Sequence, residues 1–136
     1  MQSYWKKPRA KLPSGIVTPE SVIQTQCQEY LEIRRITYFH LPDGIFGFVA
    51  SAPAIPSWFR AWFMKAFAAR PDIVFDLPVK DHYSLSFRVE LKTAKGRTHG
   101  PQTREVAAGR WALCRSLDEF VAVVTAAERL AERMRI

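Results

Sequence analysis

The sequence predicts an α/β fold in which helices flank a small mixed β-sheet. Segments of alternating apolar and polar residues are interleaved with segments of helical apolar spacing, in the order α-β-(α)-β-β-α-β-α. The chain has 136 residues, of which 48% are hydrophobic, and this suits a single domain with its own core. We therefore expect one domain over residues 18–136, preceded by a separate arm over residues 1–17.

Residues 1–17 are predicted to form an extended basic arm, because two prolines interrupt a cluster of cations. The cations are Lys6, Lys7, Arg9 and Lys11. The whole chain carries a formal charge of +7, which favours a polyanionic partner, with nucleic acid the first candidate and an anionic membrane surface the second. The arm is either a mobile tail or a segment that contacts phosphates.

The first helix is expected to begin at Thr18 as N-cap, with Pro19 as the first helical residue. Its apolar stripe consists of Ile23, Cys27, Tyr30 and Leu31. A strand over residues 36–41 follows, and Pro42, Asp43 and Gly44 end it.

Residues 45–56 are apolar but contain one glycine and two prolines, so they are predicted to form a loop. A helix capped by Ser57 then carries one stripe of apolar side chains and a second stripe of two tryptophans. The first stripe is Phe59, Phe63, Ala66 and Phe67; the second is Trp58 and Trp62. The aromatic residues either pack in the core or form an exposed face for a dimer contact, for unpaired bases or for a membrane surface.

Two strands joined by a turn at residues 78–84 are predicted next. In the first strand Ile73, Phe75 and Leu77 face the core, and in the second Phe87, Val89 and Leu91 do so. If the two apolar faces share one core, Asp72, Glu90 and Lys92 lie together on the other side. Lys92 is then ~7 Å from Glu90 along the same strand face.

The last third of the chain predicts a helix, a strand and a second helix. In the first of these two helices, Pro101 lies in the first turn and Gly109 ends the helix. Residues 110–115 fit a strand, and Ser116 and Glu119 have the spacing of a capping box. The final helix has its core face at Phe120, Val124 and Ala127.

The cysteines and the hydropathy pattern indicate a reducing compartment. Cys27 and Cys114 have no Cys or His at zinc spacing, so we interpret both as small core residues rather than as a disulfide or a metal site. No apolar run reaches membrane-spanning length, and no apolar stretch follows the N-terminal charges as in a secretory signal. We expect a cytoplasmic protein without a membrane partner.

Asp72, Glu90 and Lys92 have the chemistry that phosphodiester hydrolysis requires. Carboxylate oxygens are the ligands that Mg²⁺ and Mn²⁺ prefer, and these metals suit phosphate chemistry. A lysine beside them can orient or help to deprotonate the attacking water, or neutralise the phosphate. Carboxylates packed together repel one another unless a divalent cation lies between them. The alternative is a solvated surface with an ordinary ion pair.

The segments RPDIVF, FRVELK and GPQ, in this order, resemble the core of the PD-(D/E)XK nucleases, which have the restriction-endonuclease-like fold. The phrase VELKTAKGRTHGPQ is especially similar to the VRR-NUC branch, the virus-type replication-repair nucleases. The resemblance extends over residues 19–126. It matches Pro71-Asp72 to the PD pair, Glu90-Leu91-Lys92 to the E-x-K motif, Glu20 to the glutamate of the first helix, and Gln102 to the glutamine after the E-x-K strand.

The resemblance implies a metal-dependent endonuclease that leaves a 5′-phosphate. Asp72, Glu90, Glu20 and the carbonyl of Leu91 would hold Mg²⁺ or Mn²⁺, Lys92 would assist the water, and Gln102 would position the site. It also implies a homodimer that acts on branched DNA such as Holliday junctions, in a bacterial or phage-infected cell.

Candidate phosphate contacts are Lys95, Arg97, Arg104 and the arm. The alternative to an enzyme is a DNA-binding module that has the nuclease fold but does not cut.

Overall fold

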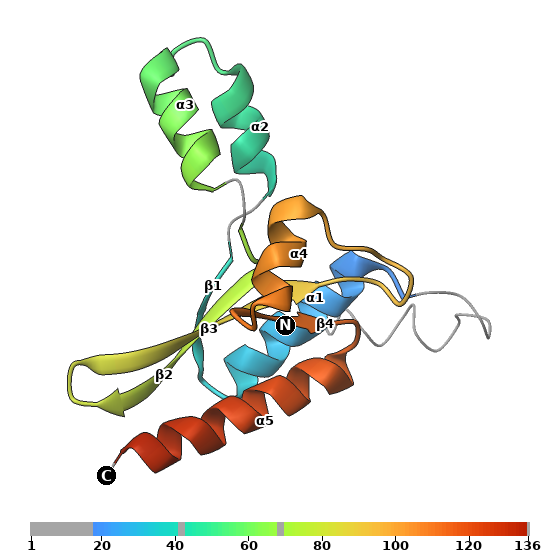
Figure 1. The fold of residues 1–136 in the computed structure, drawn as a ribbon, viewed down its shortest axis with the longest axis vertical. Helices are drawn as coiled ribbons and strands as arrows, with labels where there is room; N and C mark the ends of the chain where they lie inside the picture. Colours follow the sequence, from blue (N-terminus) through green and yellow to red (C-terminus); the bar gives the residue numbers. More distant parts are fainter. Residues whose placement is uncertain (1–17, 41–42, 68–69, 136) are drawn as a thin grey trace.

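The computed structural model describes residues 18–40, 43–67 and 70–135, and they have the predicted α/β fold (Figure 1). The helices are α1 (Glu20–Ile33), α2 (Asp43–Ser51), α3 (Ser57–Ala66), α4 (Gly100–Ala107) and α5 (Leu117–Met134). The strands are β1 (Thr37–Phe39), β2 (Ile73–Lys80), β3 (Tyr83–Leu91) and β4 (Trp111–Cys114). The basic arm predicted over residues 1–17 lies outside the described residues.

The described strands form one mixed sheet in the order β1-β2-β3-β4. β1 and β3 both pair antiparallel with β2, whereas β4 pairs parallel with β3 after the crossover through α4. Ile73 lies opposite Val89, and the pairing continues to Lys80 opposite Tyr83. The turn is therefore much shorter than the predicted 78–84, because both strands continue into that range.

The main core lies between one face of this sheet and the helices α1 and α5, which run side by side across it (Figure 1). The predicted apolar faces are confirmed for Phe75 and Val89, which are completely buried, and for Phe87, which is half-buried and stacks on Phe75 with ring centroids 5.2 Å apart. From α5, Phe120 and Val124 fill the space beneath them. This packing fixes β2 and β3 so that their polar faces point to the opposite side.

The two cysteines are buried free thiols, as predicted. Cys27 lies on α1 and Cys114 on β4, and both belong to the main core. Burial in apolar surroundings raises the pKa of each thiol to about 12, so both behave as small apolar side chains.

The first residues of α1 and α3 differ from the prediction. α1 begins at Glu20, and Pro19 rather than Thr18 occupies the N-cap position, without a side-chain hydrogen bond. α3 likewise has Pro56 rather than Ser57 at its N-cap position. In both cases proline in an extended conformation ends the preceding segment, and the helix starts with the next residue.

At α5 the capping box is only half formed. The Ser116 hydroxyl accepts a hydrogen bond from Glu119 N at 3.2 Å, as predicted, but the Glu119 carboxylate accepts one from Arg115 N instead of Ser116 N. At the end of α4, Gly109 has a φ of 76°, a left-handed conformation that ends a helix and that glycine adopts without strain.

The prediction of a loop over residues 45–56 is wrong, because α2 occupies most of this range. α2 and α3 form an antiparallel pair that projects beyond the end of the sheet, between β1 and β2 in the chain (Figure 1). The pair has an apolar cluster of its own, separate from the main core, in which Phe46, Val49 and Phe63 are buried. We call residues 43–67 the helical hairpin.

The connection within the helical hairpin is fixed by Arg60. Its guanidinium donates hydrogen bonds to the carbonyls of Val49 and Ala52, both at 3.0 Å. The stripe predicted on α3 is confirmed for Phe59, Phe63 and Phe67, which pack on one another, whereas Ala66 is exposed.

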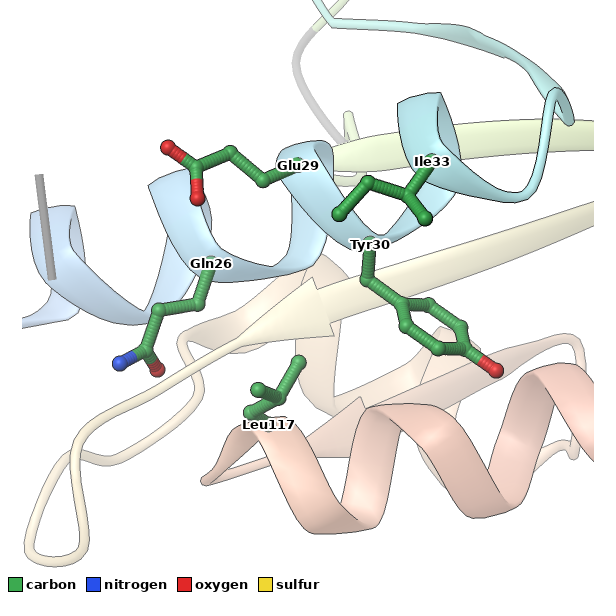
Figure 2. A pocket seen from close by; sticks show the side chains of 5 residues that line it. All are labelled: Gln26, Glu29, Tyr30, Ile33 and Leu117. Carbon is green, nitrogen blue, oxygen red and sulfur yellow. The ribbon is translucent and has the colours of Figure 1, made fainter. Parts of the chain in front are cut away.

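A shallow apolar groove lies between α1 and the start of α5 (Figure 2). It is lined by Gln26, Glu29, Tyr30, Ile33 and Leu117. Its volume of about 70 Å³ is far below that of an ordinary small-molecule pocket, so we assign it no site. In the part of the chain that the structure describes, no helix combines the length and the apolar character needed to cross a membrane.

Candidate active site at the end of the β2–β3 pair

Asp72 lies directly before β2, where β3 extends past the last residue paired with β2. The β2–β3 pairing ends at Val89, so the backbone of β2 does not reach the N–H of Leu91. The Asp72 carboxylate takes its place, and Oδ2 accepts a hydrogen bond from Leu91 N at 2.7 Å. A side chain thus forms the last link between the two strands, and Asp72 is held beside the end of β3.

The Leu91 carbonyl lies on the same edge of β3 as this hydrogen bond. In a strand the N–H and the C=O of one residue point to the same neighbour, and the next residue points to the other side. Lys92 N donates to the Cys114 carbonyl of β4 at 3.0 Å, which confirms this alternation. The carbonyl oxygen that the resemblance implies as a metal ligand therefore faces the Asp72 edge.

Glu90 is the central residue of the site and is only 2% exposed. Its Oε2 accepts a hydrogen bond from Gln102 Nε2 at 2.8 Å and lies 3.2 Å from Lys92 Nζ. Its Oε1 is buried and has no hydrogen-bond partner among the described residues. A buried carboxylate oxygen without a partner is costly, and a bound cation or an ordered water removes that cost.

The electrostatics of Glu90 reflect this burial. Loss of solvation, followed by repulsion from the Asp72 carboxylate, raises its pKa to about 7. The hydrogen bond and the positive charge of Lys92 act in the opposite direction, and Glu20 adds a smaller repulsion. Three carboxylates therefore influence one another here, and the site gains from a positive charge.

The donor set suits a hard divalent cation that keeps part of its water shell. Glu90 Oε1, the Asp72 carboxylate and the Leu91 carbonyl are the protein oxygens at hand. Mg²⁺ is commonly held by one or two carboxylates together with water. Across residues 18–40, 43–67 and 70–135, however, no three His, Cys, Asp or Glu side chains form a metal-binding group. The Glu20 carboxylate is thus close enough to raise the pKa of Glu90, but it does not complete such a group.

Two residues that the sequence analysis did not assign to the site support Asp72. His40 Nδ1 lies 2.8 Å from the Asp72 carbonyl, so Nδ1 carries the proton and donates it. Gln24 Nε2 lies 2.7 Å from His40 Nε2, which accepts. Gln24 is one helical turn after Glu20, and this spacing was the one sign in the sequence that α1 turns a second polar side chain toward the site.

Gln102 is held at both ends of its amide. Its Nε2 donates to Glu90, and its Oε1 accepts a hydrogen bond from His99 N at 3.2 Å at the start of α4. The two bonds fix which way the amide points, so α4 and Glu90 are joined through one side chain.

If Glu90 holds a divalent cation, replacing Gln102 with alanine is expected to lower the affinity for Mn²⁺ about 10- to 100-fold, as for other residues that orient a metal ligand. The free energy of unfolding should fall by about 1 kcal/mol, because α4 loses a capping bond. Titration with Mn²⁺ and urea unfolding measure the two effects. Thr103→Ala, on the next residue of α4, is the control; an equal loss of Mn²⁺ affinity there would remove Gln102 from the site.

The loop after β3 presents the predicted basic residues on the surface. Arg115 Nη1 donates to the carbonyls of Thr93 and Gly96 at 2.7 and 2.6 Å, which closes the loop. A Cβ on Gly96 would lie 3.2 Å from Thr93 N and 3.3 Å from Lys92 Cβ, so a larger residue here would require these neighbours to shift by a few tenths of an ångström. Lys95, Arg97 and Arg104 are all exposed, and Arg104 lies on α4. Lys6, Lys7, Arg9 and Lys11 lie outside the described residues.

A polar hollow of about 280 Å³ lies beside the site, lined by Pro71, Arg88, Glu105, Arg110 and Trp111. Arg110 is paired with Glu105. Arg88 and Arg110 come together only because β3 pairs with β4. Their spacing in the sequence therefore did not indicate that they line one hollow. Glu105 offsets the charge of Arg110, so Arg88 supplies the net positive charge next to the Pro71-Asp72 corner.

The chain matches no protein-family model, no curated protein and no solved structure. The resemblance to the VRR-NUC nucleases therefore stays a prediction, and the function has to be argued from the site itself.

Proposed function

We propose that this protein is a metal-dependent DNA endonuclease of the VRR-NUC type that hydrolyses phosphodiester bonds. One observation carries the proposal. Glu90, buried at the end of β3, is bonded through Oε2 to Lys92 and Gln102, while its Oε1 is left without a hydrogen-bond partner in the described part of the chain. A purely structural carboxylate would have both oxygens satisfied.

Glu90, Asp72 and the Leu91 carbonyl, with Glu20 nearby, would hold Mg²⁺ or Mn²⁺. When bound, such an ion stabilises charge on the phosphate and lowers the pKa of a coordinated water. The Lys92 side chain is 13% exposed, and its ammonium forms an ion pair with Glu90 that holds it at the edge of the site. There the ammonium orients the attacking water or offsets the phosphate charge. Gln102 holds the Glu90 carboxylate in the position in which it binds both the metal and Lys92.

Charge favours DNA as the substrate. The formal charge of the chain is +7, and Lys95, Arg97 and Arg104 are exposed on the loop and helix that follow the site. Such side chains contact phosphates without reading the base sequence, so they favour recognition of DNA shape. We propose branched DNA, such as a four-way junction, cut by a homodimer so that two sites act on two strands, in a bacterial or phage-infected cell.

Cleavage of a panel of linear, nicked, flapped and four-way DNA with Mg²⁺ or Mn²⁺ tests the proposal. We expect cuts that leave a 5′-phosphate, fastest on the branched substrates, and none in EDTA. Lys92→Ala should cut at least tenfold more slowly, because the water loses its positioning group.

The second candidate is a DNA-binding module that has the nuclease fold without the activity. It is favoured by the absence of a three-residue metal-binding group among the described His, Cys, Asp and Glu side chains. Tight binding of the panel without any metal-dependent cut would establish this alternative and remove the enzyme.

A further inference from the structure

The helical hairpin is attached directly to the candidate site. The chain leaves the sheet after β1 and returns at β2, and Figure 1 shows the hairpin projecting from that end of the sheet. The hydrogen bond from His40 Nδ1 to the Asp72 carbonyl, 2.8 Å long, joins the end of the segment that contains β1 to the residue directly before β2. Arg70 adds a second contact, with Cζ 3.4 Å from the ring centroid of Phe46. The hairpin is therefore joined to the rest of the protein close to Asp72, through the segments on either side of it.

α3 has two faces of different character. Phe59, Phe63 and Phe67 pack toward α2 and belong to the apolar cluster of the hairpin. Trp58 and Trp62, in contrast, are 71% and 57% exposed. Two exposed tryptophans one helical turn apart place apolar surface side by side, and contiguous exposed apolar surface is typical of interaction sites.

Lys65 lies on the same exposed face as the tryptophans. Residues 58, 62 and 65 are spaced by four and three, so they follow one another along one side of the helix in steps of ~5–6 Å. Trp58 lies at the tip of the hairpin, and Lys65 lies two turns closer to its base. We call Trp58, Trp62 and Lys65 the tryptophan face.

The charge of the hairpin favours a polyanion over a second copy of this basic chain. Asp43 is the only Asp or Glu in the sequence of residues 43–71, which also contains Arg60, Lys65 and Arg70. Arg60 is used inside the hairpin, so Lys65 is the cation next to the tryptophans. Two aromatic faces followed by a cation provide what unpaired nucleotides need: a surface for each base and a charge for the backbone.

We propose that the tryptophan face binds unpaired bases of the DNA substrate and that the hairpin thereby directs the site to places where the duplex opens. This inference names the substrate class of the function proposed above and rests on it. Double-stranded DNA keeps its bases stacked on one another and offers no free base face to a tryptophan. Branch points, flaps and single strands do.

Binding measured in EDTA tests the inference without any cleavage. Fluorescence anisotropy is recorded with labelled oligo(dT), with a fully paired duplex and with a flapped duplex. Trp58→Ala with Trp62→Ala should weaken binding of oligo(dT) and of the flapped DNA about tenfold or more, with less than a twofold change for the duplex. Trp58→Phe with Trp62→Phe should keep most of the affinity, because phenylalanine still offers a ring for stacking.

Lys65→Gln gives an independent measurement. If Lys65 contacts one phosphate of a single strand, the slope of log affinity against log salt should become shallower by about 0.7. The matched control is Tyr83→Ala, which removes an aromatic side chain that is 72% exposed at the opposite end of the β2–β3 pair. It should change neither the affinity for oligo(dT) nor the slope.

Three outcomes would overturn the inference. In the first, the wild-type protein binds the duplex more tightly than oligo(dT); in the second, the double variant Trp58→Ala with Trp62→Ala binds all three DNAs unchanged, or all three equally more weakly. In the third, light scattering shows that this double variant has a different oligomeric state from the wild type. The last result would assign the face to a contact between copies. Absence of cleavage with Mg²⁺ or Mn²⁺, together with tryptophan-dependent binding of oligo(dT), would reject the nuclease proposal alone.

Discussion

Replacing Glu90 with glutamine is expected to abolish metal-dependent cleavage, with a loss on the order of 10³-fold or more, because the contribution of a metal to phosphoryl chemistry is several kcal/mol. The substitution keeps the size of the side chain and an oxygen that can accept from Gln102 and Lys92. It replaces Oε1 with an NH₂ group, so the side chain loses its negative charge and one oxygen ligand, and with them the affinity for a cation. The loss should appear with every substrate of the panel.

Plasmid cleavage and Mn²⁺ titration, measured on the same preparations, check this expectation. Glu128→Gln is the matched control, since Glu128 is paired with Arg34 between α5 and α1, on the side of the sheet away from α4. It should cut at the wild-type rate. If Glu90→Gln cut as fast as the control, Glu90 would not hold the metal, and the enzyme proposal would lose its central residue.

The same substitution is expected to stabilise the metal-free protein at pH 8 by about 3 kcal/mol. The pKa of Glu90 is about 7 in the folded protein and 4.5 in its ordinary state, so folding favours the protonated form. Each pKa unit corresponds to about 1.4 kcal/mol. As pH rises from about 4.5 to about 7, the unfolded chain gives up this proton before the folded protein does, and the free energy of unfolding falls. Glutamine has no proton to lose and avoids the loss.

Urea unfolding in EDTA at pH 4.5 and pH 8 measures the effect. For the wild type and for Glu128→Gln, the free energy of unfolding should be lower at pH 8 than at pH 4.5, and the Glu90 carboxylate should account for part of that difference. For Glu90→Gln the difference between the two pH values should be smaller. Excess Mn²⁺ should restore stability to the wild type at pH 8, because the ion binds only the folded state, and should do little for Glu90→Gln. Equal pH dependence in all three proteins would mean that the Glu90 carboxylate is as well solvated in the folded protein as in the unfolded chain.

The alternation of residues in β2 and β3 was enough to predict both the core and the central part of the site. With Phe75 and Val89 facing inward, Glu90 had to face the other way, and Asp72 had to lie near the end of the neighbouring strand. Gln102 could be predicted only through the resemblance, because its contact with Glu90 depends on where α4 packs after the loop.

α2 could not be predicted because its local sequence opposes a helix. Gly44 and Gly47 each cost about 1 kcal/mol relative to alanine, and the helix is only a few turns long. Packing of Phe46 and Val49 against Phe63 offsets that cost, and the two prolines at 53 and 56 fall in the connection between α2 and α3. The helix is stabilised by its partner rather than by its own sequence.

The support of Asp72 by His40 and Gln24 was missed for a related reason. The spacing of Gln24 from Glu20 is the one local sign, and His40 has none; both residues become relevant only when β1 pairs with β2 and α1 crosses the sheet. Long-range pairing of this kind leaves little local pattern in the sequence.

The separate apolar cluster of the helical hairpin has a consequence for how such a protein can diverge. Because Phe46, Val49 and Phe63 do not belong to the main core, substitutions among them and in the main core should affect stability independently. Descendants of this chain can exchange or reshape the hairpin, and with it the preferred substrate, while Glu90 and Lys92 stay where β3 holds them.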